Sequence, residues 1–283
     1  FSIPTFRNEV PDSLDAQMIH DAKPVFERRE KMQLTYNVRN THRAVGTRFS
    51  SEITRLYGMK GLSEGHVHVR LRGSAGQSLG AFLCQGITLE VFGDANDYVG
   101  KGLSGGTIIV RPTVSSPLTS QQNSIIGNTV LYGATSGRLL AAGQAGERFA
   151  VRNSGAHVVV EGCGSNGLEY MTGGMAVILG KVGSNFGAGM TGGMAFVLDT
   201  EGDFAKMANP DSIVWQRLDS AYWEDQLKSL ITAHAQATDS AWSQSLLEDW
   251  DRRRGEFWQI CPKEMLTRLS QPLSDHEVLE AAE

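Results

Sequence analysis

The chain has 283 residues, of which 41% are hydrophobic and 20% charged, and its formal net charge is −5. Apolar side chains suffice for a sizeable core, and no apolar run approaches the ~20 residues of a membrane span or forms the core of a signal peptide. The weak negative charge provides no overall attraction to nucleic acid or anionic lipid. We therefore expect a folded chain without nucleic-acid or membrane partners.

The three cysteines, Cys84, Cys163 and Cys261, are an odd number and lie far apart. No pair has the C-x-x-C spacing typical of zinc sites, iron–sulfur clusters or redox pairs. This usage indicates a reducing compartment, and we expect a cytoplasmic protein. The first residue is Phe1, which hints at a processed chain or a piece of a longer one.

Glycine and tryptophan divide the chain into three segments. Of the 32 glycines, 29 lie between Gly58 and Gly193, whereas all five tryptophans lie beyond that stretch. Residues 200–283 carry 8 basic and 16 acidic side chains, so the acidic excess is concentrated there. We expect an N-terminal capping segment (1–58), a glycine-rich centre (59–199) and a helical tail (200–283), all within one structural domain of a larger polypeptide.

The first segment predicts a helix, a strand and a second helix. After Val10-Pro11, either Asp12 or Ser13 can cap a helix that runs to about Ala22, and Lys23-Pro24 is expected to end it. The alternating stretch Met32–Val38 indicates a strand. Residues 50–57 predict a short helix that Gly58 closes.

The central segment contains a repeat of about nineteen residues. Seven glycines precede short apolar or alternating runs, with successive spacings of 21, 20, 31, 18, 19 and 19: Gly65, Gly86, Gly106, Gly137, Gly155, Gly174 and Gly193. Residues 113–124 account for the long interval, because removing these twelve residues restores a spacing of 19. They are expected to form an inserted loop.

This period favours a β-solenoid, in which each coil buries its apolar face only by stacking on its neighbours. Parallel crossovers are overwhelmingly right-handed. The sequence thus predicts an all-β fold, a right-handed parallel β-helix of seven coils over residues 59–199. A two-layer sandwich would need hairpin turn signals, which are scarce apart from Asn166-Gly167.

The flanking segments are expected to cover the open sheet edges of the solenoid. In the tail, Trp223, Leu227, Leu230 and Ile231 form an amphipathic helical stripe, residues 245–250 continue helically, and residues 257–260 predict a strand before Pro262. The tail aromatics are expected to pack on the solenoid or on a partner.

The motif G-x-G-x-x-G occurs three times, beginning at Gly100, Gly162 and Gly187. A dinucleotide site needs this motif between a strand and a helix whose N-terminus meets the pyrophosphate. Here apolar, strand-like stretches follow, and the recurrence keeps step with the repeat. We interpret the motifs as solenoid corners and expect this chain to bind no cofactor.

Catalytic and metal-binding patterns are weak. His66-x-His68 places two imidazoles on one face of a strand, but no third metal ligand can be identified, so exposed strand histidines are favoured. No nucleophile sits in a G-x-S-x-G elbow. The sequence therefore predicts neither a metal site nor catalytic residues.

The densest polar stretch of the centre is residues 93–101, which contain Asp94, Asn96, Asp97 and Lys101. Polysaccharide-cleaving β-helices use carboxylates on such surfaces as acid, base or calcium ligand. The favoured interpretation is structural: the side chains make turn hydrogen bonds, and Asp97 pairs with Lys101.

Several longer stretches, however, resemble one family closely: residues 40–48, 73–78, 93–106, 145–155 and 169–174. They are similar to the C-terminal G-x-G-x-G domain of the glutamate synthase large subunit. The resemblance runs from about residue 10 into the tail and is densest up to Asp199, so it is far more specific than any single glycine motif.

The resemblance implies a non-catalytic β-helix wedged between an amidotransferase domain and a synthase domain. The parent enzyme of that family converts glutamine, 2-oxoglutarate and reductant to two glutamates, with FMN and an iron–sulfur cluster bound elsewhere and sometimes a small electron-transfer subunit. The N-terminal cysteine nucleophile and the cluster cysteines of the family have no counterpart here. The implied role is a scaffold that holds two active sites in place for ammonia transfer, with either NADPH or ferredoxin as electron donor.

Six polar residues at the solenoid corners are expected to contact the neighbouring domains: Asp94, Asn96, Asp97, Lys101, Glu147 and Arg148. Two other function classes remain open at this point. One is a solenoid subunit of another oxidoreductase complex, similar to formylmethanofuran dehydrogenase. The other is a carbohydrate-active β-helix that uses Asp94 and Asp97.

Overall fold

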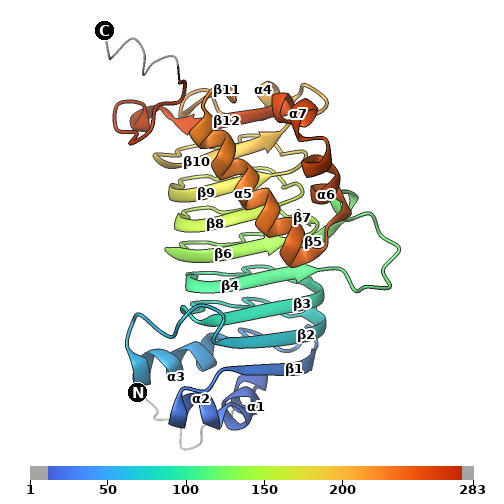
Figure 1. The fold of residues 1–283 in the computed structure, drawn as a ribbon, viewed down its shortest axis with the longest axis vertical. Coiled ribbons are helices and arrows are strands. Elements are labelled where there is room, and N and C mark those ends of the chain that lie inside the picture. The colour runs from blue at the N-terminus through green and yellow to red at the C-terminus, as the bar shows by residue number, and fades with distance from the viewer. Residues whose placement is uncertain (1–11, 276–283) are drawn as a thin grey trace, which may run out of the picture.

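Strands stacked along the long axis dominate the computed structural model, which describes residues 12–275 (Figure 1). Within this range twelve strands form one sheet, and ten of them follow the path β1-β2-β3-β4-β6-β8-β9-β10-β12-β11. The strands are β1 (Met32–Val38), β2 (Val67–Ala75), β3 (Ile87–Ala95), β4 (Ser104–Arg111), β5 (Ser124–Ile126), β6 (Ser136–Ala141), β7 (Gln144–Ala145), β8 (Ser154–Val160), β9 (Thr172–Ile178), β10 (Gly192–Leu198), β11 (Ile213–Arg217) and β12 (Phe257–Pro262).

Neighbouring strands from β1 to β10 pair in parallel, and short β5 pairs with β3 and β7 beside this ladder. In the β2–β3 pair, Val67 lies opposite Ile87 and Val69 opposite Leu89, and all four side chains are buried. Identical residue classes thus stack strand on strand, which explains why a nineteen-residue period is visible in the sequence.

The prediction of an all-β, right-handed parallel β-helix is wrong. The sheet is mixed, because β12 runs antiparallel to both β10 and β11. The described residues also form seven α-helices: α1 (Leu14–Asp21), α2 (Lys23–Arg28), α3 (Thr47–Tyr57), α4 (Phe204–Met207), α5 (Ala221–Thr238), α6 (Ala241–Glu248) and α7 (Trp250–Arg253). The glycine period reports only on the central strands. Strand β12, which follows α7, pairs with β10 at the end of the parallel strands but runs antiparallel to it.

The seven apolar runs found in the sequence nevertheless fall in seven strands, β2, β3, β4, β6, β8, β9 and β10. Residues 112–123 connect β4 to β5 as a loop that contains one 3₁₀ turn, η1 (Ser120–Gln122), at the position predicted for an insertion. Two further 3₁₀ turns, η2 (Arg254–Glu256) and η3 (Lys263–Met265), flank β12.

The N-terminal elements differ in part from expectation. Ser13 caps α1 by accepting a hydrogen bond from the Ala16 N–H, as predicted, whereas Val10-Pro11 lie outside the described residues. Helix α1 ends at Asp21 with Ala22 as its C-cap, close to the predicted end, but Pro24 then occupies the first turn of a further helix, α2, where its missing N–H is not needed. Helix α3 starts three residues before the predicted residue 50.

Helix α1 is held to α3 by a buried carboxylate. The Asp15 Oδ1 accepts from the Gly46 N–H at 2.8 Å and Oδ2 from the Phe49 N–H at 3.0 Å. Burial raises the pKa of Asp15, although the hydrogen bonds from Gly46 and Phe49 oppose the rise. The helices therefore sit in a fixed position against the β1 end of the sheet (Figure 1).

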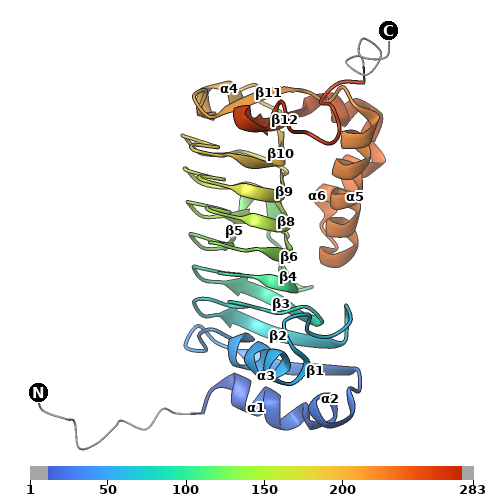
Figure 2. The same cartoon turned by 90° about the vertical axis from the view of Figure 1, so that its left-hand side faces the viewer.

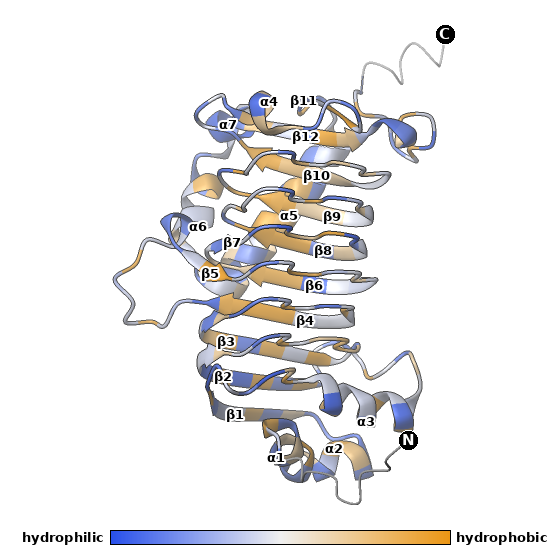
Figure 3. Cartoon of the chain, turned by 180° about the vertical axis from the view of Figure 1, so that it is seen from behind, coloured by the Kyte–Doolittle hydropathy of each residue, from blue (hydrophilic) through white to orange (hydrophobic). Residues whose placement is uncertain are grey.

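Helices α5 and α6 cover one face of the upper strands (Figure 2). Trp223, Leu227 and Ile231 of α5 pack with Val159 and Val177 in a second apolar cluster, separate from the main core. Figure 3 shows that the strands carry long hydrophobic segments, as expected where both faces of a sheet are buried. None of the described helices has the length and apolar character to cross a membrane.

Asp199 organises the connection after β10. It accepts hydrogen bonds from the N–H groups of Gly202, Asp203 and Phe204, and from the Trp258 indole at 2.9 Å. Burial raises the pKa of Asp199, but these hydrogen bonds outweigh it and lower the pKa below its ordinary value.

We expect Asp199→Asn to lower the free energy of unfolding at pH 7 by about 1–2 kcal/mol, because the amide accepts fewer hydrogen bonds. A carboxyl with a depressed native pKa stabilises above its unfolded pKa and loses that contribution as the pH falls through the native pKa. Urea unfolding at pH 7 and at successively lower pH should therefore show the difference from wild type shrinking. Exposed Asp211→Asn is the control, and a difference independent of pH would contradict the assignment.

Candidate interaction surface

Six five-residue turns recur between the strands, at residues 78–82, 98–102, 129–133, 148–152, 166–170 and 185–189. In each, the first, third and fifth residues have positive φ. Glycine occupies only six of these eighteen positions: Gly80, Gly100, Gly102, Gly133, Gly187 and Gly189. The G-x-G-x-G spacing is thus a conformational rule of the turns, and several side chains adopt the left-handed region that glycine prefers.

Hydrogen bonds between successive turns hold this conformation. In the fourth turn, the N–H groups of Arg148 and Arg152 donate forward to the Ser165 and Glu169 carbonyls at 2.9 and 3.0 Å. The N–H of Ala150 donates backward to the Val130 carbonyl at 2.8 Å. A non-glycine residue at positive φ costs roughly 1–3 kcal/mol, so these bonds offset a substantial strain.

The same geometry sorts side chains between core and solvent. The second and third positions point into the core, where they are fully or almost fully buried: Leu79, Val99, Val130, Leu131, Phe149, Ala150, Leu168 and Phe186. Side chains at the first, fourth and fifth positions reach the outside in several turns. Seven of these residues make up what we call the turn face: Phe82, Tyr98, Lys101, Tyr132, Arg148, Arg152 and Tyr170.

Two of the six residues singled out from the sequence, Asp97 and Glu147, lie at the edge of this face. The Asp97 Oδ1 accepts from the Asn128 N–H at 2.7 Å, and the Asn128 Oδ1 accepts from the Glu147 N–H at 2.8 Å. Asp97, Asn128 and Glu147 each directly precede the first residue of a turn, so they form one column. Sequence reasoning missed Asn128, although aligning the turns by their first residues would have found it.

The other four residues singled out from the sequence lie outside this column. Asp94 lies at the end of β3 opposite Ser74, and Asn96 follows the strand; both side chains are exposed. The Lys101 ammonium lies 5.8 Å from the centroid of the Tyr98 ring, and no ion pair joins it to Asp97, contrary to the predicted pairing. Arg148 instead forms an ion pair with Glu169 at 3.2 Å.

Possible catalytic groups are engaged elsewhere. The His68 Nε2 lies 2.8 Å from the Glu90 carboxylate, whereas the His66 Nδ1 lies 3.2 Å from the Ser63 hydroxyl, so the two imidazoles have separate partners. Across residues 12–275, no group of three or more His, Cys, Asp or Glu side chains is placed to hold a metal ion. Burial raises the pKa of the Cys163 thiol to about 12, which makes it a poor nucleophile.

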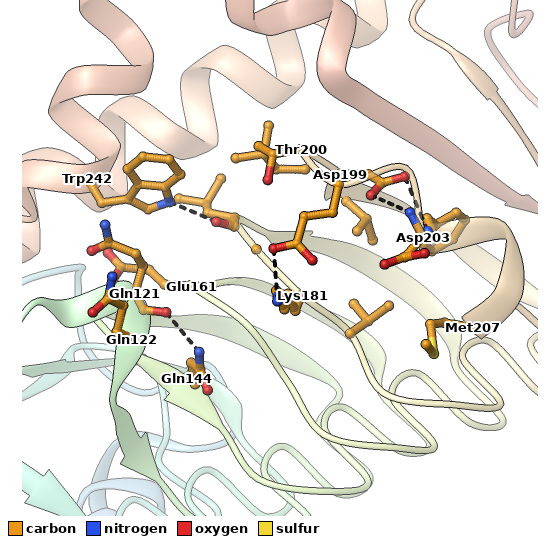
Figure 4. A pocket seen from close by; sticks show the side chains of 17 residues that line it. Gln121, Gln122, Gln144, Glu161, Lys181, Asp199, Thr200, Asp203, Met207 and Trp242 are labelled. Atoms are coloured by element: carbon orange, nitrogen blue, oxygen red, sulfur yellow. Dashed lines mark hydrogen bonds and ion pairs between the residues drawn. The ribbon is translucent and has the colours of Figure 1, made fainter.

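A cavity of about 680 Å³ lies between the strand ends and helices α4 and α6 (Figure 4). At its mouth, Lys181 pairs with Glu201 at 2.9 Å, and Asp199 caps α4. Its wall includes Glu161, which is fully buried and bonded to His234 and Ser240. These polar groups hold the fold together, so the cavity provides no catalytic constellation of its own.

Comparison with known proteins gives consistent matches. Residues 15–263 match the GXGXG motif family. The chain is 65% identical over 267 residues to the glutamate synthase [NADPH] large chain of Azospirillum brasilense, a match that covers 94% of this chain and 18% of that protein. It is 51% identical to ferredoxin-dependent glutamate synthase 2 of Synechocystis sp., with 81% and 15% covered. For the glutamate synthase [NADPH] large chain of Bacillus subtilis the identity is 43%, with 96% and 18% covered.

The chain thus spans less than a fifth of the length of these relatives. The family match over residues 15–263 includes all the stretches quoted from the sequence. The chain therefore belongs to the GXGXG motif family, as its resemblance to the GXGXG domain of the glutamate synthase large subunit predicted.

Proposed function

We propose that this chain is a non-catalytic scaffold within a glutamate synthase, which forms two glutamates from glutamine, 2-oxoglutarate and reductant. One observation carries the proposal: relatives of that name match nearly the whole chain, yet the chain spans only 18% of the Azospirillum protein. The chemistry is then assigned to the remainder of the polypeptide. The chain would hold the amidotransferase and synthase domains in place for ammonia transfer.

The described residues do not fit the cofactors of such an enzyme. Cys84, Cys163 and Cys261 are all buried and unpaired, and they lie in separate parts of the strand stack, so they do not assemble cluster ligands. The glycine-rich turns lead into strands instead of opening helices, so they lack the helix N-terminus that would receive an FMN phosphate. FMN and an iron–sulfur cluster therefore belong elsewhere in the parent enzyme.

The architecture suits a scaffold. A ladder of hydrogen-bonded strands with stacked, mutually bonded turns offers few places for a hinge, because bending it would separate many bonds at once. The polar corner residues Asp94, Asn96, Asp97, Lys101, Glu147 and Arg148 are proposed as contacts to neighbouring domains. No observation favours a formylmethanofuran dehydrogenase-like subunit or a carbohydrate-active protein.

Charge reversal at the corners of the complete enzyme tests this proposal. Asp94→Lys combined with Arg148→Glu should lower the glutamate formed per glutamine hydrolysed by about fivefold, because like charges would oppose the neighbouring domains. Asp97 is kept intact, since its carboxylate also holds the Asn128 N–H. Lys181→Glu is the matched control, because Lys181 is 75% exposed and pairs with Glu201 instead of belonging to the corner residues. Unchanged coupling in the double variant would refute these contacts.

A further inference from the structure

The turn face concentrates exposed aromatic side chains on one side of the molecule. Phe82, Tyr98, Tyr132 and Tyr170 are 55%, 39%, 39% and 50% exposed. They occupy the outward positions of stacked turns, which successive backbone hydrogen bonds hold in register. Among the described residues, Tyr222 is the one other aromatic side chain of comparable exposure.

The rings of Phe82 and Tyr170 lie along the surface because glycine in the next turn leaves room for them. A Cβ on Gly102 would meet the Phe82 ring at 2.4 Å, and a Cβ on Gly189 would meet the Tyr170 ring at the same distance. Both glycines occupy the fifth position of their turns. The rings are therefore held flat against the backbone, which limits the conformational entropy that they would lose on binding.

Cations are placed among these rings without carboxylate partners. Arg152 lies over Tyr170 with its guanidinium 5.7 Å from the ring centroid, and Lys101 lies over Tyr98. Within residues 12–275, neither cation forms an ion pair, whereas Arg148 nearby is paired with Glu169. A surface that covers this face would need acidic groups for Arg152 and Lys101.

We propose that the turn face docks onto another domain of the same polypeptide, through a surface on that domain that is apolar with acidic side chains. This inference rests on the proposed function and names the contact surface of the scaffold. Tyrosine, phenylalanine and arginine are among the residues enriched in the cores of protein interfaces. The relatives carry more than four fifths of their length outside the matched region, which supplies the occupant.

The dimensions of the face agree with such a contact. The five turns that carry the face, at a spacing of about 4.8 Å, extend over roughly 19 Å between their backbones. A standard interface buries about 800 Å² on each partner, which is a patch of similar width. Helices α5 and α6 already cover one face of the upper strands, whereas the turn face carries four of the five exposed aromatic side chains among the described residues (Figure 2).

Hydroxyl-radical footprinting of the complete wild-type polypeptide tests the inference. For each tyrosine, the oxidation rate in the native enzyme is divided by the rate in urea. An uncovered turn face predicts ratios near the exposed fractions. Docking predicts that Tyr98, Tyr132 and Tyr170 react at least about tenfold more slowly in the native enzyme than in urea. Met59, which is 84% exposed on the loop after α3, calibrates the native scale.

Arg152→Glu in the complete polypeptide provides a second measurement. The variant should raise the oxidation rate of Tyr170 about fivefold by placing a carboxylate against the acidic partner surface. The control is Lys206→Glu on α4, where the lysine is similarly exposed and pairs with Asp203.

Two outcomes overturn the inference and separate it from the proposed function. If the three tyrosines react as uncovered groups while other surface peptides of this chain are protected, the docking face lies elsewhere and the scaffold role stands. If no surface of the chain is protected in the complete polypeptide, both the docking face and the scaffold role are wrong.

Discussion

Replacing Phe149 by alanine is expected to lower the free energy of unfolding by about 3–5 kcal/mol. Phe149 occupies the second position of the fourth turn and is fully buried. Glycine stands at the same position of the next turn, at Gly167, and Phe186 follows one turn further. A glycine thus lies between the two aromatic rings in this column, so the same position of the next turn offers no side chain to fill the space vacated by Phe149.

The backbone around Phe149 also resists collapse. Its carbonyl accepts from the Leu168 N–H at 2.7 Å, and the turns on either side are bonded to it as well. A cavity that cannot collapse carries the largest penalty, so the value should fall in the upper part of the range. Urea unfolding followed by circular dichroism measures the loss.

Two further variants make the Phe149 result interpretable. Phe149→Leu retains most of the apolar volume and should lose less than half as much stability. Val114→Ala, at a side chain that is 87% exposed in the inserted loop, should change stability by less than about 0.5 kcal/mol. A loss below about 1 kcal/mol in Phe149→Ala would mean that the turns can repack, contrary to the stacking described above.

Replacing Glu161 by alanine is expected to lower the free energy of unfolding by a similar amount, about 3–5 kcal/mol. Glu161 directly follows β8, and its Oε1 accepts from the Ser240 hydroxyl and lies 3.3 Å from the His234 Nε2. Both Glu161 and His234 are completely buried. Alanine would leave the His234 imidazole without its partner and the Ser240 hydroxyl without the acceptor for its proton, both in an apolar interior.

The loss should be largest in the contacts between the helices and the sheet, because His234 belongs to α5 and Ser240 caps α6. Hydrogen exchange of the α5 and α6 amides should therefore accelerate more than exchange in β2 and β3. Glu161→Gln retains an acceptor for Ser240 and should lose less. Glu201→Gln, at an ion pair that is half exposed, should change stability by less than about 1 kcal/mol. Equal losses in the two glutamine variants would contradict the role of burial.

Local signals carried much of the fold. The alternation over Met32–Val38 corresponds to β1 without an error in either bound, and Ser13 caps α1 as its position before an amphipathic stretch indicates. The prediction of the fold class failed outside the glycine-rich centre, where the helices and the antiparallel strand lie. The antiparallel return of β12 is set by the path through α5, α6 and α7, and no local pattern in residues 257–260 specifies strand direction.

The surface was less predictable than the core. Asp97 and Glu147 could be found in the sequence because they are charged residues in a glycine-rich background. The outward placement of Tyr98 and Arg152 could not, because both adopt positive φ although neither residue type favours it. Their conformation follows from hydrogen bonds to adjacent turns. Glu161 gave no signal, because its partner His234 lies 73 residues away in sequence.

The alternating direction of the turn hydrogen bonds limits how this chain can change in length. Removing one residue from a turn would move the following N–H groups out of the positions that donate to adjacent turns, so the bonds along the stack would be lost from that turn. Additions are accommodated outside the turns, as residues 112–123 show, or as complete repeats. Such a molecule should evolve by duplicating and losing whole repeats, and its relatives should differ in length mainly in the loops between strands.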